Sequence, residues 1–507
     1  MPAAQARHIV PGLVALWRRG TAALRGESAA EESLPGQQGP HRTAILACVA
    51  LLGVFWGGVV AVAGINALYL CVSLIGCAFI LFDFRIGVVL LILLAPISAS
   101  PLFPHAMLGI TGLNPLNLLL LGTLGSCLLR GLSDGSLRHF LPRPLLWLFV
   151  VPILVAGGIG SRHIGEIAPA FHIVPDVIDF KDAPGYLIEM VAKPLSMVVF
   201  ALLVGAAASR SAKPEKFLIP MVISIWVMGL ILLAFVAQSG IALNQLASSD
   251  SRAFLSILGL HANDQGRLYT VAYALLLFIW AESKQPGPRL ALLASMGLMV
   301  TVLVLTFSRG AFVGFILVNV LFLLWRRSVK ALVFFMLLAS IALFALPEAV
   351  YDRVATGEGE GLDAISAGRV NGLWIPLLPE VWRSPIYGSG LGSIMWSEPM
   401  RVGGGANVLV ATHPHNAYLQ ALLDMGVIGL ILLCAYFMHV WRGLRALSRD
   451  AALSPPLRGL FQGAAAGLLG MLVSSFTDGS LTPRPEQVFL WLSIGMMYGQ
   501  LNKRPAI

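Results

Sequence analysis

The chain has 507 residues, of which 57% are hydrophobic and only 12% are charged, and its formal net charge is +9. Soluble globular domains have about a quarter of their residues charged, so this composition excludes an ordinary soluble domain. The basic residues gather in alternate short loops, which is a membrane-topology signal, and they do not indicate a nucleic-acid partner.

Apolar stretches long enough to cross a bilayer recur along the whole sequence. A helix needs about 20 residues to span the ~30 Å hydrocarbon core. We therefore predict an all-α, polytopic membrane protein with about fourteen transmembrane helices. The predicted spans are 44–63, 65–82, 86–101, 111–129, 144–160, 187–208, 217–238, 268–283, 290–307, 310–325, 331–347, 416–440, 458–476 and 486–502.

The Lys and Arg residues of the short loops predict the orientation, because such residues are enriched on the cytoplasmic side. Both termini are expected inside. The expected organisation is a cytoplasmic N-terminal segment over 1–43, a transmembrane region with smaller outer loops over 44–347, a large outer loop over 348–415 and C-terminal transmembrane helices over 416–507. Residues 1–43 also lack the apolar core of a cleavable signal peptide.

The segment from His413 to Leu419 lies where the large outer loop meets a long apolar span. It contains two imidazoles, His413 and His415, beside Asn416 and Tyr418. Histidine is the side chain best suited to moving protons near neutral pH. A lone histidine here would more often belong to a helix start anchored at the interface. The arginines of the outer loops favour a functional interpretation.

Two arginines stand out in the outer segments. Arg309 follows an apolar run and is predicted on the outer side of the membrane, where Lys and Arg are less common. An arginine at the end of a span costs free energy unless it meets an anion, a carboxylate or water. Arg369 begins a stretch predicted as a helix on the membrane surface, with Trp374 and Trp382 as interface anchors. The other candidates on this side are His413, Arg252, Arg267, Arg353, Arg383, Arg401 and Arg484.

The planar guanidinium group binds phosphate with two parallel hydrogen bonds. Several arginines with one histidine at an interface therefore predict a lipid-borne phosphate or diphosphate and a proton transfer beside it. Binding of anionic lipid head groups is the alternative. The outer loop over 161–186 contains His163, His172 and Asp176, but their spacing matches no recognised metal pattern. We expect no metal, and arginines take the charge-stabilising role that Mg²⁺ has elsewhere.

Two further patterns allow structural interpretations. Asn263-Asp264 precedes a predicted span and is expected to cap that helix. Pro385 to Gly392 predicts a tight glycine-rich turn, which either offers backbone N–H groups to phosphate or is only a turn.

These motifs together resemble the O-antigen ligase and polymerase superfamily. The motifs appear in the superfamily's order, within about residues 250–490, and the large loop precedes the histidine motif. They are Ser308-Arg309-Gly310-Ala311, Gly368-Arg369 leading to Trp374, Pro385 to Gly390, and His415-Asn416-Ala417-Tyr418-Leu419 with Asp424, Gly426 and Gly429.

The resemblance implies a metal-independent, inverting glycosyltransferase without a cofactor. Members transfer glycans from an undecaprenyl-diphosphate carrier at the periplasmic face of the bacterial inner membrane, so the large outer loop would be periplasmic. His415 resembles the essential histidine, and Arg309 and Arg369 resemble the arginines that hold the diphosphate. The second histidine, His413, departs from the pattern and leaves open which imidazole is the base. The expected substrate-binding residues are Arg309, Arg369, His413, Asn416, Tyr418, Arg267, Arg383 and Arg484.

The expected partners are membrane lipid, a lipid-linked glycan and a glycan acceptor. The acceptor is lipid A-core for a ligase, which we favour, or a growing glycan for an O-antigen, exopolysaccharide or capsule polymerase. A lipid-linked oligosaccharide flippase or transporter is an alternative from another class. It would need ionisable groups or broken helices near the midplane, often in paired repeats. The sequence contains no internal repeat, and its candidate groups cluster on one side.

Overall fold

The computed structural model describes residues 50–51, 53–58, 61, 64–101, 103–107, 110–135, 140–173, 178, 180–241, 255, 259–327, 329, 332–333, 336–337, 351, 361–402 and 409–503. The chain divides into two compact units, Met1–Leu68 and Tyr69–Ile507. Apart from the start of α3, all the elements named below belong to the second unit.

The described elements are almost all helical, as predicted. The long helices are α3 (Ile65–Phe82), α4 (Phe84–Leu94), α5 (Pro115–Asp134), α7 (Val151–Gly160), α10 (Lys193–Ser209), α11 (Leu218–Ser239), α14 (Ala262–Glu282), α15 (Pro286–Leu305), α16 (Arg309–Arg326), α22 (Ala417–Ser448), α23 (Pro455–Ser474) and α24 (Val488–Asn502). The short elements are α6 (Arg143–Leu145), α8 (Ala170–Ile173), α9 (Ala183–Leu187), α19 (Leu362–Ile365), α20 (Ile375–Arg383) and α21 (Glu398–Arg401), the π-helical turns η3 (Leu146–Val150), η5 (Ile188–Ala192) and η8 (Val370–Trp374), the 3₁₀ turns η1 (Ala95–Ile97), η4 (Ile164–Glu166), η6 (Pro214–Phe217), η9 (Ser393–Trp396) and η10 (Pro485–Gln487), and the antiparallel strands β1 (Ala106–Met107) and β2 (Ile110–Thr111).

Within the described residues, nine helices are long and apolar enough to cross a membrane. They are Ile65–Phe82, Pro115–Asp134, Arg143–Gly160, Ala183–Ser209, Pro214–Ser239, Pro286–Leu305, Arg309–Arg326, Ala417–Ser448 and Pro455–Ser474. The multi-span, all-α class is confirmed, and the count of fourteen stays a prediction. The predicted spans 44–63 and 331–347 lie largely outside the described residues.

Three other predicted spans correspond to helices that are shorter or more polar than a typical span. The prediction 86–101 corresponds to the short α4 followed by η1, and 486–502 corresponds to the 15-residue α24. The prediction 268–283 corresponds to α14, whose first turns contain polar residues and whose length is nearly all buried. Because neighbouring helices rather than lipid surround α14, it can place polar groups inside the protein.

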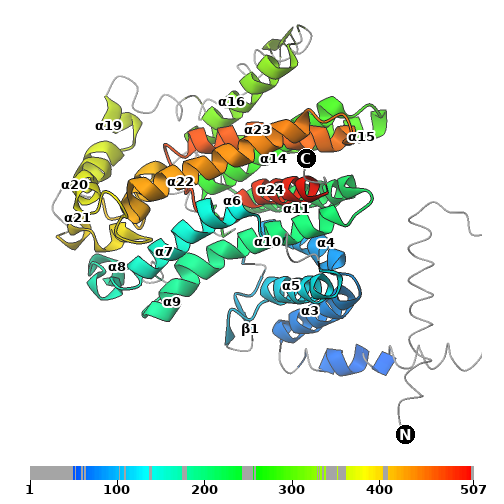
Figure 1. Ribbon diagram of the computed structural model, residues 1–507, viewed down its shortest axis with the longest axis horizontal. Coiled ribbons are helices and arrows are strands. Elements are labelled where there is room, and N and C mark those ends of the chain that lie inside the picture. The colour runs from blue at the N-terminus through cyan, green and yellow to red at the C-terminus, as the bar shows by residue number, and fades with distance from the viewer. Residues whose placement is uncertain are drawn as a thin grey trace, which may run out of the picture. The chain divides into compact units, whose positions relative to one another are not determined.

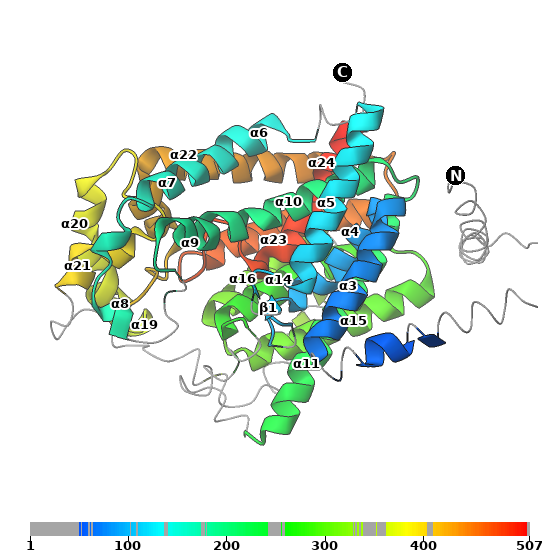
Figure 2. The same ribbon diagram turned by 90° about the horizontal axis from the view of Figure 1, so that it is seen from below.

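The helices around α14 form the centre of the second unit. Helix α14 packs against α15, α16 and α23, while α23 also contacts α22, and α10 packs along α24 (Figures 1 and 2). A Cβ atom at Gly459 or Gly463 of α23 would lie 2.6 Å from a backbone carbonyl oxygen of α14. Small residues allow such close helix contacts in membranes. The starts of α14 and α16 and the end of α23 are thereby held together.

The short helices α19, α20 and α21 gather at one end of the long helices (Figures 1 and 2). The predicted helix from Arg369 to Trp382 is confirmed as helical structure, because η8 and α20 run through it without a gap. Its place on the membrane surface stays a prediction. The side chain of Trp382 is 78% exposed, as an interface anchor should be.

Helix α22 is broken one-third of the way along, at Gly426, where φ is 63° and ψ is −168°. The glycine-rich turn predicted from Pro385 docks into this break. Ser389 N donates to the carbonyl of Leu423 at 2.8 Å, and Val427 N donates to the carbonyl of Pro385 at 2.8 Å. The turn therefore supplies backbone partners that the broken helix lacks.

Candidate active site

His415 is the last residue of the large loop, directly before the cap of α22, and its backbone has a positive φ of 51°. Asn416 then caps α22, because its side-chain oxygen accepts hydrogen bonds from the backbone N–H groups of Tyr418 at 3.0 Å and Leu419 at 3.1 Å. Such a φ is uncommon for a residue other than glycine and needs support from its surroundings.

The neighbours of His415 provide that support. The indole Nε1 of Trp374 donates to the carbonyl of Pro414 at 2.8 Å, and Ala417 N donates to the carbonyl of Ser475 at 2.9 Å. The Tyr418 hydroxyl donates to the carbonyl of Leu472 at 2.8 Å. Trp374, expected at the membrane interface, is thus half-buried and fixes the histidine loop. The predicted substrate contacts of Asn416 and Tyr418 stay predictions, since both side chains also hold the start of α22.

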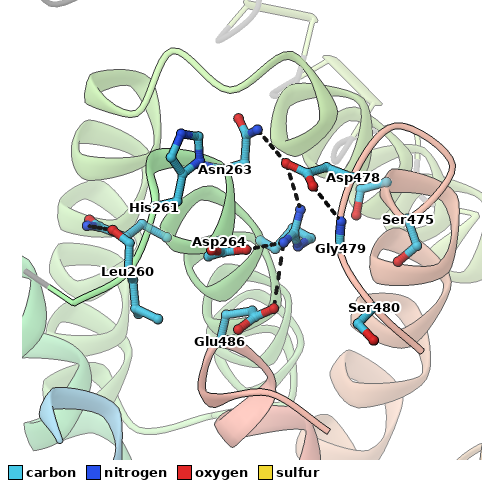
Figure 3. Close-up of polar contacts among 12 residues, drawn as sticks. Leu260, His261, Asn263, Asp264, Ser475, Asp478, Gly479, Ser480 and Glu486 are labelled. Atoms are coloured by element: carbon cyan, nitrogen blue, oxygen red, sulfur yellow. Dashed lines mark hydrogen bonds and ion pairs between the residues drawn. The ribbon is translucent and has the colours of Figure 1, made fainter. Parts of the chain in front are cut away.

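Both imidazoles of the motif meet one carboxylate, Asp478, in the loop between α23 and η10. The Nδ1 atom of His415 lies 3.2 Å from Oδ1 of Asp478, and the Nε2 atom of His413 lies 3.6 Å from the same oxygen. The backbone N–H of Gly479 also donates to this oxygen at 2.8 Å (Figure 3). A carboxylate facing Nδ1 fixes the tautomer of an imidazole and stabilises its protonated form.

The second oxygen of Asp478 faces α14. Asn263 Nδ2 donates to Oδ2 at 2.5 Å, and Arg267 Nη1 lies 3.9 Å from it. The Arg267 side chain also forms an ion pair with Asp264 and lies 3.6 Å from Oε1 of Glu486 (Figure 3). Arg267 is only 5% exposed. Arg267 therefore lies among three carboxylates, which the sequence did not indicate. Its expected role in substrate binding stays a prediction.

The charges of this cluster determine its protonation. Burial alone would raise the pKa of Asp478, but hydrogen bonds from His413 and His415 and the charge of Arg267 hold it well below the ordinary value. Burial lowers the pKa of His413, the charges of His415 and Arg484 lower it further, and Asp478 opposes them. A lowered pKa makes His413 a weaker proton acceptor than an ordinary histidine.

Arg369 and Arg309 approach the same loop from two other elements. Arg369 Nη1 donates to the carbonyl of Thr477 at 2.6 Å, directly before Asp478. A Cβ atom at Gly310, next to Arg309, would lie 2.7 Å from the Thr477 hydroxyl oxygen. Burial lowers the pKa of Arg369, the charge of Asp478 raises it, and the charge of Arg309 lowers it. The two guanidinium groups are therefore close enough to repel each other.

Residues 475–478 are thus the meeting point of the predicted site. His415 contacts this loop at Asp478, Arg369 contacts it at Thr477, and the start of α16 beside Arg309 packs against it. Helix α16 begins at Arg309, with the Ser308 side chain accepting from the backbone N–H of Ala311. Helix N-termini favour anions, so the helix adds to the positive potential of the two arginines.

The remaining predicted residues are placed differently. Arg484 directly precedes η10 and is close enough for its charge to act on His413. Arg383 is exposed at the end of α20, where it pairs with Glu380 and Glu398. Arg401 is exposed at the end of α21. Arg252, Arg353 and Asp176 lie outside the described residues.

Sequence reasoning missed Asp478, Asp264 and Glu486. The one available signal was the rarity of carboxylates near the predicted spans, since such groups need a partner or a function. The expectation that Asn263-Asp264 caps α14 was wrong. The cap is His261, whose Nδ1 accepts from Asn263 N at 3.2 Å, and the two polar side chains turn to Asp478 and Arg267 instead (Figure 3).

Comparison with known families adds an independent finding. The family model described as O-antigen ligase matches residues 294–434. This segment of the chain is thus similar to the O-antigen ligase family. The superfamily resemblance predicted from the motifs is confirmed, and the match supports glycosyl transfer of the ligase or polymerase type. No curated protein matches the chain.

The segment matched by the O-antigen ligase model contains only part of the site. Arg309, Arg369 and both histidines lie inside 294–434. Arg267 and Asp478 lie outside this segment and are brought to it by the packing of α14 and α23. The carboxylate partner of the histidines therefore comes from a part of the chain that the family match does not cover.

Proposed function

We propose that the protein is an O-antigen ligase-like glycosyltransferase. It moves a glycan from undecaprenyl diphosphate to a lipid A-core or similar acceptor at the periplasmic face of the bacterial inner membrane. The observation that carries the proposal is the pairing of His415 with Asp478 beside Arg369, which lies close to Arg309. This arrangement offers a base and an anion site at one place.

The proposed reaction uses each of these groups once. The acceptor hydroxyl gives its proton to Nε2 of His415, while the Nδ1–H of the same ring donates to Asp478. The acceptor oxygen attacks C1 of the first sugar from the face opposite the diphosphate, so the configuration inverts. Arg309 and Arg369 neutralise the diphosphate as the bond from C1 breaks. Charge stabilisation by fixed donors in a site of low polarity is a large catalytic effect.

The two ends of the long helices support the proposed orientation. Helices α14 and α16 begin at the candidate site. At their other ends, Glu282 binds Arg326 at 2.7 Å and Arg458 at 3.2 Å. Because basic residues favour the cytoplasmic side, the opposite end of the same helices would face the periplasm. A lipid-linked donor flipped to the periplasm would enter laterally, with its tail in the bilayer.

Glycan analysis of a deletion strain tests the proposal. A ligase predicts loss of long-chain lipopolysaccharide and accumulation of full-length polymer on undecaprenyl diphosphate. Accumulation of single repeat units would indicate the polymerase instead. Complementation with the wild-type gene should restore the product and complementation with His415→Ala should not. An unchanged glycan profile in the deletion strain would overturn both assignments.

Transfer and transport are separated by an assay in detergent. A transferase joins donor and acceptor in micelles, whereas a flippase needs two compartments and forms no new glycosidic bond. The product should appear with the purified protein and be absent with His415→Ala. Flipping of the lipid-linked glycan in liposomes without any transfer product in micelles would support the transporter.

A further inference from the structure

Three side chains at the candidate active site carry atoms that could bind a metal ion, a property that the proposed reaction does not require. The donor atoms of His413, His415 and Asp478 all lie within 4.8 Å of one another. The two nitrogen atoms are 3.6 Å and 3.2 Å from the same carboxylate oxygen. In a tetrahedral zinc site with bonds of about 2.0–2.2 Å, neighbouring donor atoms lie about 3.3–3.6 Å apart. Two of the three separations therefore already approximate those of a zinc site.

Two of the three donor side chains have a further contact, and the backbone next to the third, His415, is held in place. Asn263 donates to the second oxygen of Asp478 at 2.5 Å. The hydroxyl of Thr412 lies 3.4 Å from Nδ1 of His413, which leaves Nε2 toward the carboxylate. The backbone of His415 is fixed through the hydrogen bond from Trp374 to Pro414. Outer partners of this kind orient metal ligands and strengthen metal binding.

We propose that His413, His415 and Asp478 form a binding site for a divalent transition-metal ion such as Zn²⁺, and that the bound ion inhibits glycosyl transfer. The inhibition rests on the proposed function, whereas the binding does not. Two imidazoles and one carboxylate are a donor set that suits Zn²⁺, with water completing the coordination.

The surrounding charges indicate a reversible site rather than a permanently held ion. The charge of Arg267 is compensated by its ion pair with Asp264 and opposes a cation only weakly. Arg369 and Arg484 lie near enough to act on Asp478 and His413, and they disfavour an additional positive charge. We therefore assign an ion that exchanges with solution, which agrees with turnover that needs no metal.

Inhibition follows from the two nitrogen atoms of His415. Coordination through Nδ1 displaces the proton from that atom to solvent, and Nε2 takes up one proton from solvent in exchange, so the charge of the ring does not change. The neutral ring then carries its hydrogen on Nε2, and Nε2 has no lone pair to accept the acceptor's proton.

Cobalt binding tests the site without any assay of activity. Full-length protein purified in detergent without a histidine tag is titrated with Co²⁺, whose visible absorption reports low-coordinate binding. We expect one saturable site that Zn²⁺ displaces. His413→Ala should weaken Co²⁺ binding at least about tenfold, since even outer partners contribute that much. His163→Gln removes a histidine that pairs with Glu166 outside the donor set and serves as the control.

Several results would overturn the site. They are the absence of a saturable Co²⁺ signal in the wild-type protein, equal binding by His413→Ala, or loss of binding in His163→Gln. If His413→Ala does not fold, His413→Gln and Asp478→Asn provide the same comparison with side chains of similar size. Elution volume and thermal unfolding establish that each variant is folded.

The inhibition is measured separately, with the metal-free rate of each protein as its own reference. Zn²⁺ should lower the turnover of the wild-type protein at least about tenfold, in proportion to occupancy of the Co²⁺ site. It should leave binding of the lipid donor nearly unchanged. His413→Ala should lose the sensitivity to Zn²⁺. Co²⁺ binding without inhibition by Zn²⁺ would refute the inhibitory role, whereas absence of transfer in metal-free protein would refute the proposed function alone.

Discussion

The Nδ1 atom of His415 lies 3.2 Å from Oδ1 of Asp478, although 63 residues separate the two in the sequence. This contact joins the end of the large loop to the short loop after α23. It gives the proposed base an anionic partner and orients its second nitrogen. A base and its orienting carboxylate form a functional unit in several unrelated enzymes.

Replacement of the base should separate chemistry from binding. His415→Ala should lower turnover about 10²–10⁴-fold, the usual contribution of a positioned base, and leave binding of the lipid donor nearly intact. Asp478→Asn should lower turnover with little change in KM, because it alters the tautomer and not the diphosphate site. Turnover and donor binding are measured on the same purified proteins. A loss of donor binding equal to the loss of turnover in His415→Ala would contradict the assignment.

The two arginines should behave as ligands of the diphosphate. Arg309→Ala and Arg369→Ala should each weaken donor binding by about 1.5–3 kcal/mol, or one to two decades, because a charge-assisted hydrogen bond is lost. Lys at either position should restore donor binding only partly, since it keeps the positive charge but lacks the two parallel N–H donors of the guanidinium group. Arg210→Ala removes a guanidinium that pairs with Asp134 and is the matched control. Full rescue by Lys would argue against a bidentate contact.

The buried ion cluster should make stability depend on pH. Burial and the nearby Asp264 raise the pKa of Glu486 from its usual 4.5 to about 7, against the charges of Arg267 and Arg484. A raised carboxyl pKa contributes stability that is complete below about pH 4.5 and is lost as the pH rises through about 7. Glu486→Gln should therefore flatten the decline in unfolding temperature between these pH values. An unchanged pH profile would contradict the raised pKa.

Replacement of Arg267 should destabilise the protein more than replacement of Glu486. Arg267→Ala leaves Asp264, Asp478 and Glu486 without their shared cation, and breaking a buried ion pair typically costs about 3–5 kcal/mol. The unfolding temperature in detergent should drop accordingly, while Glu486→Gln should have a mild effect below about pH 7. Equal losses for both variants would show that packing alone is responsible.

Chelation should not abolish activity. EDTA should leave transfer by the purified protein intact, because the arginines take the place of a metal in the proposed reaction. Removal of adventitious Zn²⁺ should, if anything, raise the rate. Loss of activity that Mg²⁺ or Mn²⁺ restores would refute the arginine-based account.

Reporter fusions test the orientation. At Gly359 in the large loop, only a reporter enzyme that works in the periplasm should be active. At the C-terminus, only a reporter that works in the cytoplasm should be active. The physical reason is that loops rich in Lys and Arg alternate along the chain with loops poor in them, and the basic loops favour the cytoplasmic side. The same side for both positions would contradict the fourteen-span prediction, which places three spans, an odd number, between Gly359 and the C-terminus.

The sequence predicted the helical class and the motif residues because both follow from local patterns. Apolar runs specify spans, and His415, Arg309 and Arg369 stand out because charged or ionisable groups are rare beside such runs. The partner of His415 was not predictable in this way. Nothing local indicates which of several short loops folds against the histidine motif.

Arg267 illustrates a second limit of the sequence. A guanidinium group beside an apolar span suits a phosphate and a buried carboxylate equally well. The packing of α14 against α23 places Asp264, Asp478 and Glu486 around Arg267, which no local pattern indicated. The break at Gly426 was equally hidden, since an isolated glycine in an apolar helix is usually a packing position.

The docking of the glycine-rich turn into α22 has a consequence for how the protein is made. At the break, the carbonyl of Leu423 accepts from Ser389 N and the N–H of Val427 donates to the carbonyl of Pro385. Unpaired backbone groups cost several kcal/mol in hydrocarbon. A ribosome synthesises the turn before α22, so the turn is already available when the broken helix reaches the bilayer. Insertion of α22 and closure of the loop above it should therefore be a single step of biogenesis.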